Sequence, residues 1–483
     1  MFVFLLVAGA NVASAQDDAA PSSAVRPTPA PLITVAPSPA PRPSASDKIL
    51  TSGTIRAYEF YRTNGVQNAA NPNRQAFDFG GSLHFEYHRG DTPLYIATTY
   101  AGTYPFGLNG QQPENNPFVD NSLPGFALST FDELYVGYSN PYVQAKVGNQ
   151  VINTPWASAS DTRIKPVAFQ GASFAVDAGK GVTLLFDDMV RFESRTSSAF
   201  GRYTLLTAPV PGAANALLPA TAETDTSGFV MGGITYQPVK QFEVALVDYR
   251  FDGIANMLYL QAQDNIAPRW PAGVTVGVQF VRESTDLPTA VGKIDNQTIG
   301  LQIGTTLAKN LTIAAAGDYA PWQQATVPLA SCAAATYLTT GFFLPSGGTP
   351  SCVPNGNGTA TIYYGGIASP YTDSYATDPL YTTSISQGMA DRRSAGTSEK
   401  ASITYQPFNR RLRLIVSQAW YNYGNGAGPN LTREFNADAT YFLNRVTSSV
   451  YHGLSVRYRY ADRTQPTLPF DFKYNRAQLE YDF

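Results

Sequence analysis

The chain has 483 residues, of which 14% are charged and 12% are aromatic, and its formal net charge is −3. Soluble domains carry roughly 25% charged residues, so the composition departs from that of a soluble protein, and the net charge argues against nucleic acid as a partner. The sequence has no run of about 18 apolar residues, which excludes a membrane-spanning helix, whereas its abundant tyrosine suits the aromatic girdles of a membrane β-barrel.

The N-terminal region predicts export rather than a folded domain. Residues 1–15 are mostly apolar and end in an Ala-Ser-Ala sequence. Small residues two positions apart mark a cleavage site, so we predict a secretory signal peptide cut before Gln16, although no basic residue precedes the apolar run. Residues 16–48 are rich in Pro, Ala and Ser and cannot bury a core, which predicts a disordered periplasmic linker.

Residues 49–483 repeat one unit, in which a strand of about nine to thirteen residues is followed by a tight turn, a returning strand and a longer polar segment. Apolar and polar residues alternate along these strands, for example over 274–280. Counting weaker strands near 254–263 and 384–391, we predict about eighteen strands, give or take two. The expected fold is all-β: a transmembrane antiparallel β-barrel with short periplasmic turns and long extracellular loops. The tight turns are predicted at 89–91, 139–141, 179–181, 238–240, 308–310 and 407–409, and the long loops around 103–128, 193–225 and 321–380.

The two cysteines, Cys332 and Cys352, lie in a long polar loop. In an oxidising periplasmic or surface environment they are predicted to form a disulfide. A metal or redox site would need further ligands, and the loop contains no histidine. We therefore expect no metal and no cofactor.

The alternation also predicts which charged residues face the lumen. On 410–421 and 451–462 the aliphatic and tyrosine side chains point to lipid, which leaves the arginines inside. We expect a basic patch along one side of the lumen, with acids opposite that include Glu480 and Asp482, although a wet wall in which Arg and Asp merely pair would show the same pattern. The predicted cations are Lys400, Arg411, Arg413, Arg457, Arg459 and Arg476, and the other predicted acids are Glu133, Glu434 and Asp438.

The last strand ends the pattern on an aromatic residue. Ala477, Leu479, Tyr481 and Phe483 share one face, and the polar residues between them share the other. A terminal Phe, an aromatic two residues before it and an apolar residue two before that resemble the C-terminal signal of bacterial outer-membrane barrels.

Two further stretches carry a family resemblance. Residues 147–171 read VGNQVINTPWASASDTRIKPVAFQG, and residues 378–384 read DPLYTTS, followed by Gly388 and Lys400. Together they resemble the OprD-type family of substrate-selective outer-membrane porins. The resemblance implies passive uptake of small solutes, often carboxylates or basic amino acids, through a constriction with a basic ladder on one side and acids opposite.

The first stretch also supplies candidate solute-binding residues by this resemblance: Asp161, Arg163 and their neighbour Lys165. The alternative is that Asp161 and Arg163 form a pair that pins the loop to the barrel wall without touching solute. The sequence leaves both open.

The sequence thus predicts a bacterial outer-membrane porin for passive diffusion of small hydrophilic solutes, with some charge selectivity. The predicted partners are outer-membrane lipid and small solutes, and the barrel could be a monomer or a trimer. A non-conducting adhesive barrel is the alternative. A barrel hydrolase is less favoured, because none of the three histidines lies in a recognisable hydrolase motif.

Overall fold

The computed structural model describes most of the region predicted to form the barrel. The predicted signal peptide and linker lie outside the described residues, apart from Asp47 and Lys48, and so do Cys332 and Asp161. The described residues are 47–64, 73–109, 123–159, 163–207, 223–266, 273–285, 294–308, 310–329, 352–367, 369–371, 378–390, 394–424, 431–443, 453–465 and 472–483.

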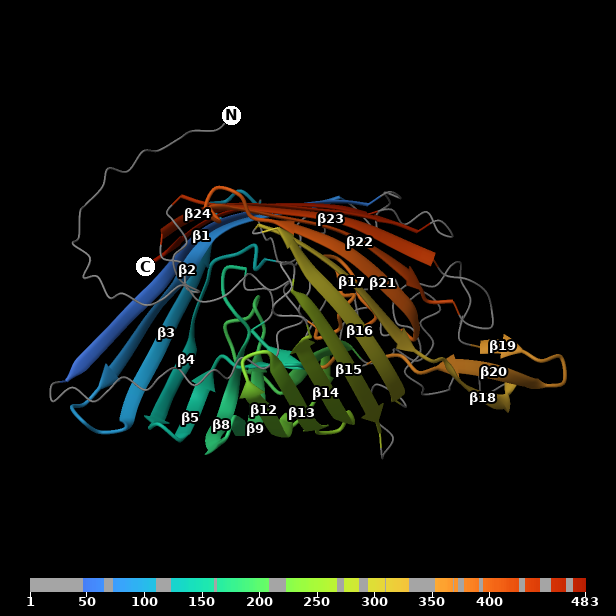
Figure 1. Cartoon of the computed structure of the whole chain (residues 1–483), viewed down its shortest axis with the longest axis horizontal. Helices are drawn as coiled ribbons and strands as arrows, with labels where there is room; N and C mark the ends of the chain where they lie inside the picture. Colours follow the sequence, from blue (N-terminus) through green and yellow to red (C-terminus); the bar gives the residue numbers. More distant parts are fainter. Residues whose placement is uncertain are drawn as a thin grey trace.

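Eighteen strands form one antiparallel sheet that closes on itself, because β1 pairs with both β2 and β25 (Figure 1). This confirms the predicted all-β barrel of about eighteen strands. The wall strands are β1 (Lys48–Asn64), β2 (Arg74–His88), β3 (Leu94–Tyr104), β4 (Leu128–Ser139), β5 (Val143–Gln150), β8 (Ala168–Gly179), β9 (Val182–Glu193), β12 (Phe229–Val239), β13 (Phe242–Phe251), β14 (Ala255–Asn265), β15 (Val274–Ser284), β16 (Asp295–Ala308), β17 (Leu311–Ala320), β21 (Gly396–Tyr405), β22 (Leu412–Asn422), β23 (Leu431–Phe442), β24 (Gly453–Thr464) and β25 (Phe472–Asp482).

Seven shorter strands lie outside this sheet and pair among themselves. The sheet of β18 to β20 projects beyond one end of the wall, at the right of Figure 1. Cys352 begins β19, and because Cys332 lies outside the described residues, the disulfide stays a prediction. The shorter strands are β6 (Asn153–Thr154), β7 (Ala157–Ser158), β10 (Tyr203–Thr207), β11 (Glu223–Asp225), β18 (Gln323–Pro328), β19 (Cys352–Pro354) and β20 (Thr359–Tyr364).

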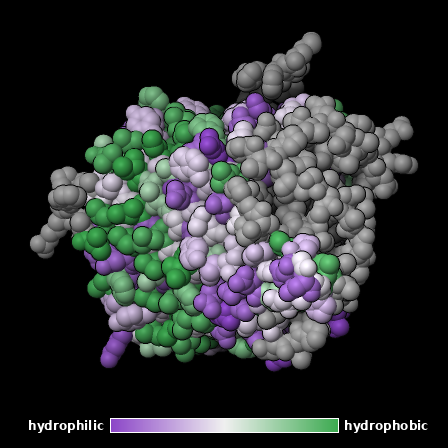
Figure 2. All heavy atoms as spheres, turned by 90° about the vertical axis from the view of Figure 1, so that its right-hand side faces the viewer, coloured by the Kyte–Doolittle hydropathy of each residue, from purple (hydrophilic) through white to green (hydrophobic). Residues whose placement is uncertain are grey.

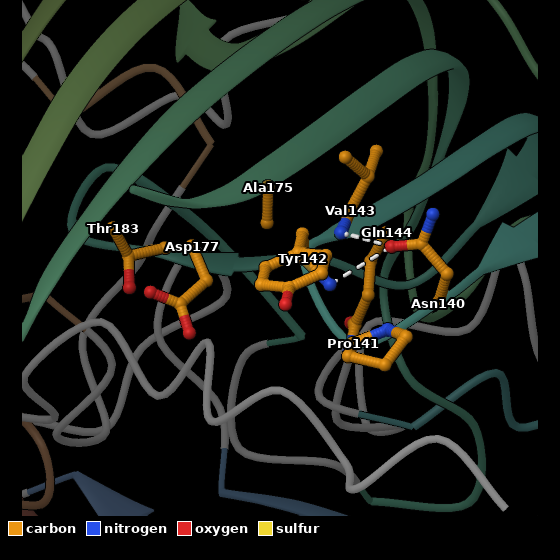
Figure 3. Close-up of a pocket in the computed structure, with 8 residues that line it drawn as sticks. All are labelled: Asn140, Pro141, Tyr142, Val143, Gln144, Ala175, Asp177 and Thr183. Carbon is orange, nitrogen blue, oxygen red and sulfur yellow. Dashed lines mark hydrogen bonds between the residues drawn. The ribbon is translucent and has the colours of Figure 1, made fainter. Parts of the chain in front are cut away.

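Most wall strands are joined by tight turns at one end of the barrel, which we call the turn end, and by longer connections at the loop end. Five of the six predicted tight turns are confirmed, and the sixth, at 308–310, includes Lys309, which lies outside the described residues. Figure 3 shows the one between β4 and β5, where the side-chain oxygen of Asn140 accepts hydrogen bonds from the backbone N–H of Tyr142 (2.8 Å) and Val143 (2.7 Å). The asparagine side chain takes the place of a backbone acceptor in this way, which stabilises a short turn.

One predicted strand is wrong. The weak signal near 254–263 corresponds to β14, but residues 384–390 form turns and coil that lie buried inside the ring. Their polar groups bond to lumen side chains rather than to a neighbouring strand, as when Glu434 accepts a hydrogen bond from the backbone N–H of Ser386 (2.8 Å). A short alternating pattern cannot distinguish these two kinds of partner.

The outer face of the wall exposes large apolar side chains that a soluble protein would bury. Leu301 is 54% exposed and Ile303 is 51% exposed, and on β25 the face with Tyr481 and Phe483 also points outward. In Figure 2 hydrophobic residues gather along one side of the face shown, and hydrophilic residues gather toward its middle. Such an apolar outer surface is suited to lipid. Within the described residues, no helix is long and apolar enough to cross a membrane.

The ring closes where the two ends of the barrel sequence meet. Phe483 and Gly53 exchange two backbone hydrogen bonds, of 2.9 and 3.0 Å. A side chain at position 53 would meet the Phe483 ring at 2.6 Å and the Ser82 carbonyl oxygen at 2.7 Å. Glycine at position 53 therefore leaves room for the backbone of β2 and for the Phe483 ring at this point.

Candidate functional site

Among the described parts of the chain that lie inside the ring, two segments contain or contact the predicted site residues. The first lumenal segment comprises residues 151–159 and 163–167, between β5 and β8, and the second comprises residues 378–390, between β17 and β21. Every residue of the second segment is buried, and Trp156 of the first is 0% exposed. Buried backbone groups need hydrogen-bond partners, so both segments depend on polar side chains of the wall.

One side of the lumen is apolar and packs against both segments. Trp156, Leu380 and Met389 from the segments join wall residues of β9 and β12 to β14, such as Val247, in one buried cluster. At its centre lies Tyr371, whose ring centroid is 5.0 to 5.8 Å from those of four phenylalanines. Aromatic pairs at such distances add to the stabilisation from buried area, so this side of the lumen is a packed core that excludes water. The four phenylalanines are Phe169, Phe192, Phe229 and Phe251.

The segments also reach the opposite side of the ring. Ile164 of the first segment and Ile385 of the second join a smaller buried cluster on β1 and β25, which includes Phe60 and Tyr474. Each segment therefore contacts two facing parts of the wall and spans the lumen between them.

Two buried carboxylates hold the second segment. Glu434 on β23 accepts hydrogen bonds from both the backbone N–H (2.8 Å) and the hydroxyl (2.5 Å) of Ser386. Asp318 on β17 accepts the same pair of bonds from Thr382, at 2.8 and 2.6 Å. Glu434 is 0% exposed and Asp318 is 3% exposed. Charge-assisted hydrogen bonds of this kind are stronger than neutral ones, so these carboxylates fix the path of the segment.

Two further groups of the wall donate hydrogen bonds to the second segment. Lys400 donates a hydrogen bond to the carbonyl oxygen of Thr383, and the Tyr421 hydroxyl donates one to the carbonyl oxygen of Thr382 (2.7 Å). Burial raises the pKa of Tyr381 in the same segment, so its phenol stays neutral. Lys400 and Glu434 thus point inward, as the alternation predicts, but they contact the segment.

A buried ion cluster holds the first segment. The Lys165 ammonium lies 3.1 Å from a carboxylate oxygen of Asp132 and 3.6 Å from one of Glu193, and all three side chains are at most 1% exposed. Thr130 donates a further hydrogen bond to Glu193 (2.8 Å). The predicted site residue Lys165 is therefore enclosed by the wall of β4 and β9, and we call this set, with Asp318, Lys400 and Glu434, the loop anchors.

Two other predicted residues contact the first segment or belong to it. The backbone carbonyl of Arg163 accepts a hydrogen bond from Arg56 on β1 (3.0 Å), and its guanidinium lies 5.9 Å from the centre of the Phe60 ring. Glu133 accepts a hydrogen bond from the backbone N–H of Val151 (3.2 Å). Arg163 is only 1% exposed, so its contacts resemble those of a residue that pins a loop.

Five other inward arginines cluster on nearby strands, and we call them the arginine wall. Their position follows from the alternation, since Val456 and Tyr458 on β24 point outward with 46% and 48% exposure. Arg56 joins this set and was not foreseen, because on β1 aromatic residues face inward and Glu59 faces outward. The members are Arg56 on β1, Arg413 on β22, Arg457 and Arg459 on β24, and Arg476 on β25.

The carboxylates predicted to oppose these arginines are in fact their neighbours. Asp438 on β23 lies between β22 and β24 and bonds to Arg457 at 2.9 and 2.5 Å and to Arg459 at 2.8 Å. Glu480 forms an ion pair with Arg56 from the adjacent strand. The expectation of acids across the lumen from the basic patch is therefore corrected for these residues.

The members of the wall differ in exposure. The side chains of Arg56, Arg457 and Arg459 are 14%, 19% and 11% exposed, so they reach solvent in the lumen. Arg476 points inward but is 1% exposed, and its guanidinium lies 4.5 Å from the centre of the Tyr58 ring. Only part of the predicted basic patch is thus open to a solute.

The prediction for Arg411 is wrong. This residue lies in the tight turn between β21 and β22, where its side chain is exposed at the turn end of the barrel. β22 begins one residue later, at Leu412, so the alternation that placed Arg411 in the lumen does not extend to it.

A second polar group on the wall combines Glu133 with His84. The Thr99 hydroxyl lies 2.5 Å from Glu133 and 2.7 Å from His84, and the nearest atoms of His84 and Glu133 are 3.6 Å apart. Among the described residues, no three His, Cys, Asp or Glu side chains lie close enough to hold a metal ion. The site therefore consists of loop anchors, the arginine wall and this smaller group.

The chain is similar in sequence to one protein family and in fold to several solved structures. Residues 142–318 match the family model described as outer membrane porin, OprD family, and the match includes the stretch that holds the first lumenal segment. No curated protein sequence matches the chain.

Solved structures from Pseudomonas aeruginosa share the fold. OpdO is 18% identical with a TM-score of 0.62, covering 92% of this chain and 98% of that one. OccK8 (OprE) is 13% identical with a TM-score of 0.64, covering 90% and 98%. OpdK, solved with vanillate, is 14% identical with a TM-score of 0.64, covering 90% and 98%.

Proposed function

We propose that the chain is an outer-membrane porin of the OprD type, and that it admits small carboxylates by passive diffusion along the arginine wall. A porin supplies no energy coupling, so selectivity must come from the groups that line the passage. The proposal assigns the chain no catalytic step and leaves its oligomeric state open. The proposal therefore places the solute at the members of the arginine wall that reach solvent, which are Arg56, Arg457 and Arg459.

The excess of positive charge on one side of the lumen is the observation that carries this proposal. Within the wall, five arginines lie beside three carboxylates, Asp438, Glu480 and Asp482. A guanidinium presents planar donors that match a carboxylate with two parallel hydrogen bonds. OpdK, which shares the fold, was solved with vanillate, itself a carboxylate.

The packing of the rest of the lumen supports the same side as the route. The apolar cluster fills the lumen along β9 and β12 to β14, and both lumenal segments are pinned to the wall. A hydrated anion would lose its water at the apolar side without gaining a partner. At the arginine wall it gains charge-assisted donors instead.

Single-channel recording of the refolded barrel in a planar bilayer tests the proposal. With a salt gradient, we expect the reversal potential to show anion preference, and we expect vanillate or benzoate to reduce the current. In Arg457→Gln/Arg459→Gln both effects should weaken. The matched control, Arg89→Gln/Lys180→Gln, removes the same charge from tight turns and should behave as the parent. Cation preference in the parent, or an unchanged preference in the lumen variant, would contradict the proposal.

A further inference from the structure

The lipid-facing side of the wall carries a groove of about 670 Å³ between β15 and β23. Two neighbouring rows of outward side chains line it, each row following the cross-strand register from β15 or β16 to β22 or β23. The row nearer the turn end contains Val274, Ile313, Ile403 and Val416, and the next row contains Ile303, Ala315, Ala401, Gln418 and Phe435.

Small residues at the centre of the second row make the hollow. Ala315 on β17 and Ala401 on β21 are direct cross-strand partners. On one side of them Ile303 is 51% exposed, and on the other side Gln418 pairs with Ala401 and is followed by Phe435, which is 39% exposed, so these larger side chains form the flanks. A depression with an alanine floor and branched or aromatic flanks is a shape that a single hydrocarbon chain fills well.

A basic turn lies at the turn end of this groove. β21 leaves the groove at Ile403 and reaches the turn at Pro407, four residues later, which at about 3.3 Å per residue is about 13 Å. Arg410 and Arg411 lie in that turn with exposed side chains. The turn end of such a barrel faces the periplasm, so both arginines lie at the level of the inner-leaflet headgroups.

We infer that the groove and the basic turn bind one anionic phospholipid of the inner leaflet, with an acyl chain on the alanine floor and the phosphate on Arg410 and Arg411. Charge complementarity selects this occupant over a second copy of the barrel, because paired basic residues beside a membrane attract anionic headgroups. The turn between β4 and β5 offers a contrast, since it places Pro141 and the exposed Tyr142 at the same end without a cation (Figure 3).

Lipid retention by the full-length barrel tests the inference. The protein is refolded into vesicles of equal parts phosphatidylglycerol and phosphatidylcholine, extracted in mild detergent, and weighed by native mass spectrometry. We expect the parent to retain one phosphatidylglycerol per barrel. Arg410→Gln/Arg411→Gln should reduce the preference for phosphatidylglycerol over phosphatidylcholine about tenfold, and Ala401→Phe should reduce the retention of both lipids.

Matched controls separate the groove from the rest of the outer surface. Ala145→Phe adds the same ring on β5, where Ala145 pairs with the outward Phe174, and Arg89→Gln/Lys180→Gln removes the same charge from other turns. Both should retain lipid as the parent does. Arg410→Gln/Arg411→Gln changes only exposed turn residues, so it still tests the inference if Ala401→Phe does not fold.

Three outcomes would overturn the inference. One is parent-like lipid retention in a folded Ala401→Phe barrel, and another is an unchanged lipid preference in Arg410→Gln/Arg411→Gln. The third is a mass of two barrels that falls to one in Ala401→Phe, which would assign the groove to a second copy of the chain.

Discussion

The loop anchors and the arginine wall use similar charged residues at different depths in the same lumen. Lys165 is 1% exposed between two carboxylates, whereas Arg457 on the wall is 19% exposed beside one. A charge that is fully enclosed must be matched by fixed partners, because nothing else compensates the loss of its hydration. A charge left partly exposed keeps some capacity for a solute.

The comparison also separates two tasks of a narrow channel. The anchors set where the lumenal segments lie, and so determine the shape of the passage. The arginine wall sets the electrostatic potential along it. Substitutions in the first set should therefore change stability and conductance, and substitutions in the second should change ion preference.

The largest expected effect is on the buried cluster. Lys165→Met leaves Asp132 and Glu193 without their cation, which should lower the free energy of unfolding by about 3 to 5 kcal/mol. Guanidinium-induced unfolding of the refolded barrel measures this change. Lys165→Met/Asp132→Asn/Glu193→Gln removes all three charges and should recover most of the lost stability. If Lys165→Met were as stable as the parent, the enclosed Lys165 would not depend on fixed partners as proposed.

Release of the second lumenal segment should have the next largest effect. Asp318→Ala/Glu434→Ala removes the acceptors of Thr382 and Ser386, at a cost of about 1 to 3 kcal/mol for each group left unpaired. The segment should loosen, and single-channel conductance should rise severalfold with added current noise. Glu399→Ala is the control, since this acid on β21 faces outward. Equal conductance in all three proteins would show that the segment does not limit the current.

An intermediate case lies on β3. Thr99 donates a hydrogen bond to Glu133, which is partly exposed but also accepts a bond from the first lumenal segment. Thr99→Val should lower the free energy of unfolding by about 1 kcal/mol, and Thr98→Val, on the outer face of the same strand, should have a smaller effect. Guanidinium-induced unfolding measures both variants. A larger loss of stability in Thr98→Val than in Thr99→Val would show that the bond from Thr99 to Glu133 does not contribute as expected.

The smallest effect concerns the wall itself. Asp438→Asn removes the carboxylate between Arg457 and Arg459, so it should increase anion preference, opposite in sign to an arginine substitution. One charge at about 7 Å in water contributes about 0.6 kcal/mol, or about a threefold change in permeability ratio. The reversal potential in a salt gradient measures it, and a shift toward cations would show that Asp438 does not offset the wall.

Much of the barrel could be predicted from sequence because its signals are local. Alternation identifies the outward face of β25, and the tight turns fix the ends of most hairpins. The second lumenal segment escaped prediction because its partners are distant: Ser386 bonds to Glu434, 48 residues away. A strand and a pinned loop can share a short alternating pattern, and only the partner distinguishes them.

The sequence predicted that most site residues face the lumen, but not how deeply each of them is buried. A period of two places Lys400, Glu434 and Arg459 on the inward face, as the structure has them. The alternation does not show which residues cover these side chains, because their burial depends on where the lumenal segments cross the lumen. Whether an inward charge supports a loop or faces a solute is therefore decided by contacts between residues far apart in the chain.

The seam between β1 and β25 has a consequence for assembly. Thr54 pairs with Asp482, whereas most wall strands pair with the strand that follows them in the chain. Local hairpins form with little loss of chain entropy, and this one long-range contact completes the ring. Once the seam is closed, the wall has no free edge, so the lumenal segments can enter only through an open end of the cylinder. A lumenal segment that is still outside when β1 and β25 pair must therefore thread into the barrel as a loop through one of those ends.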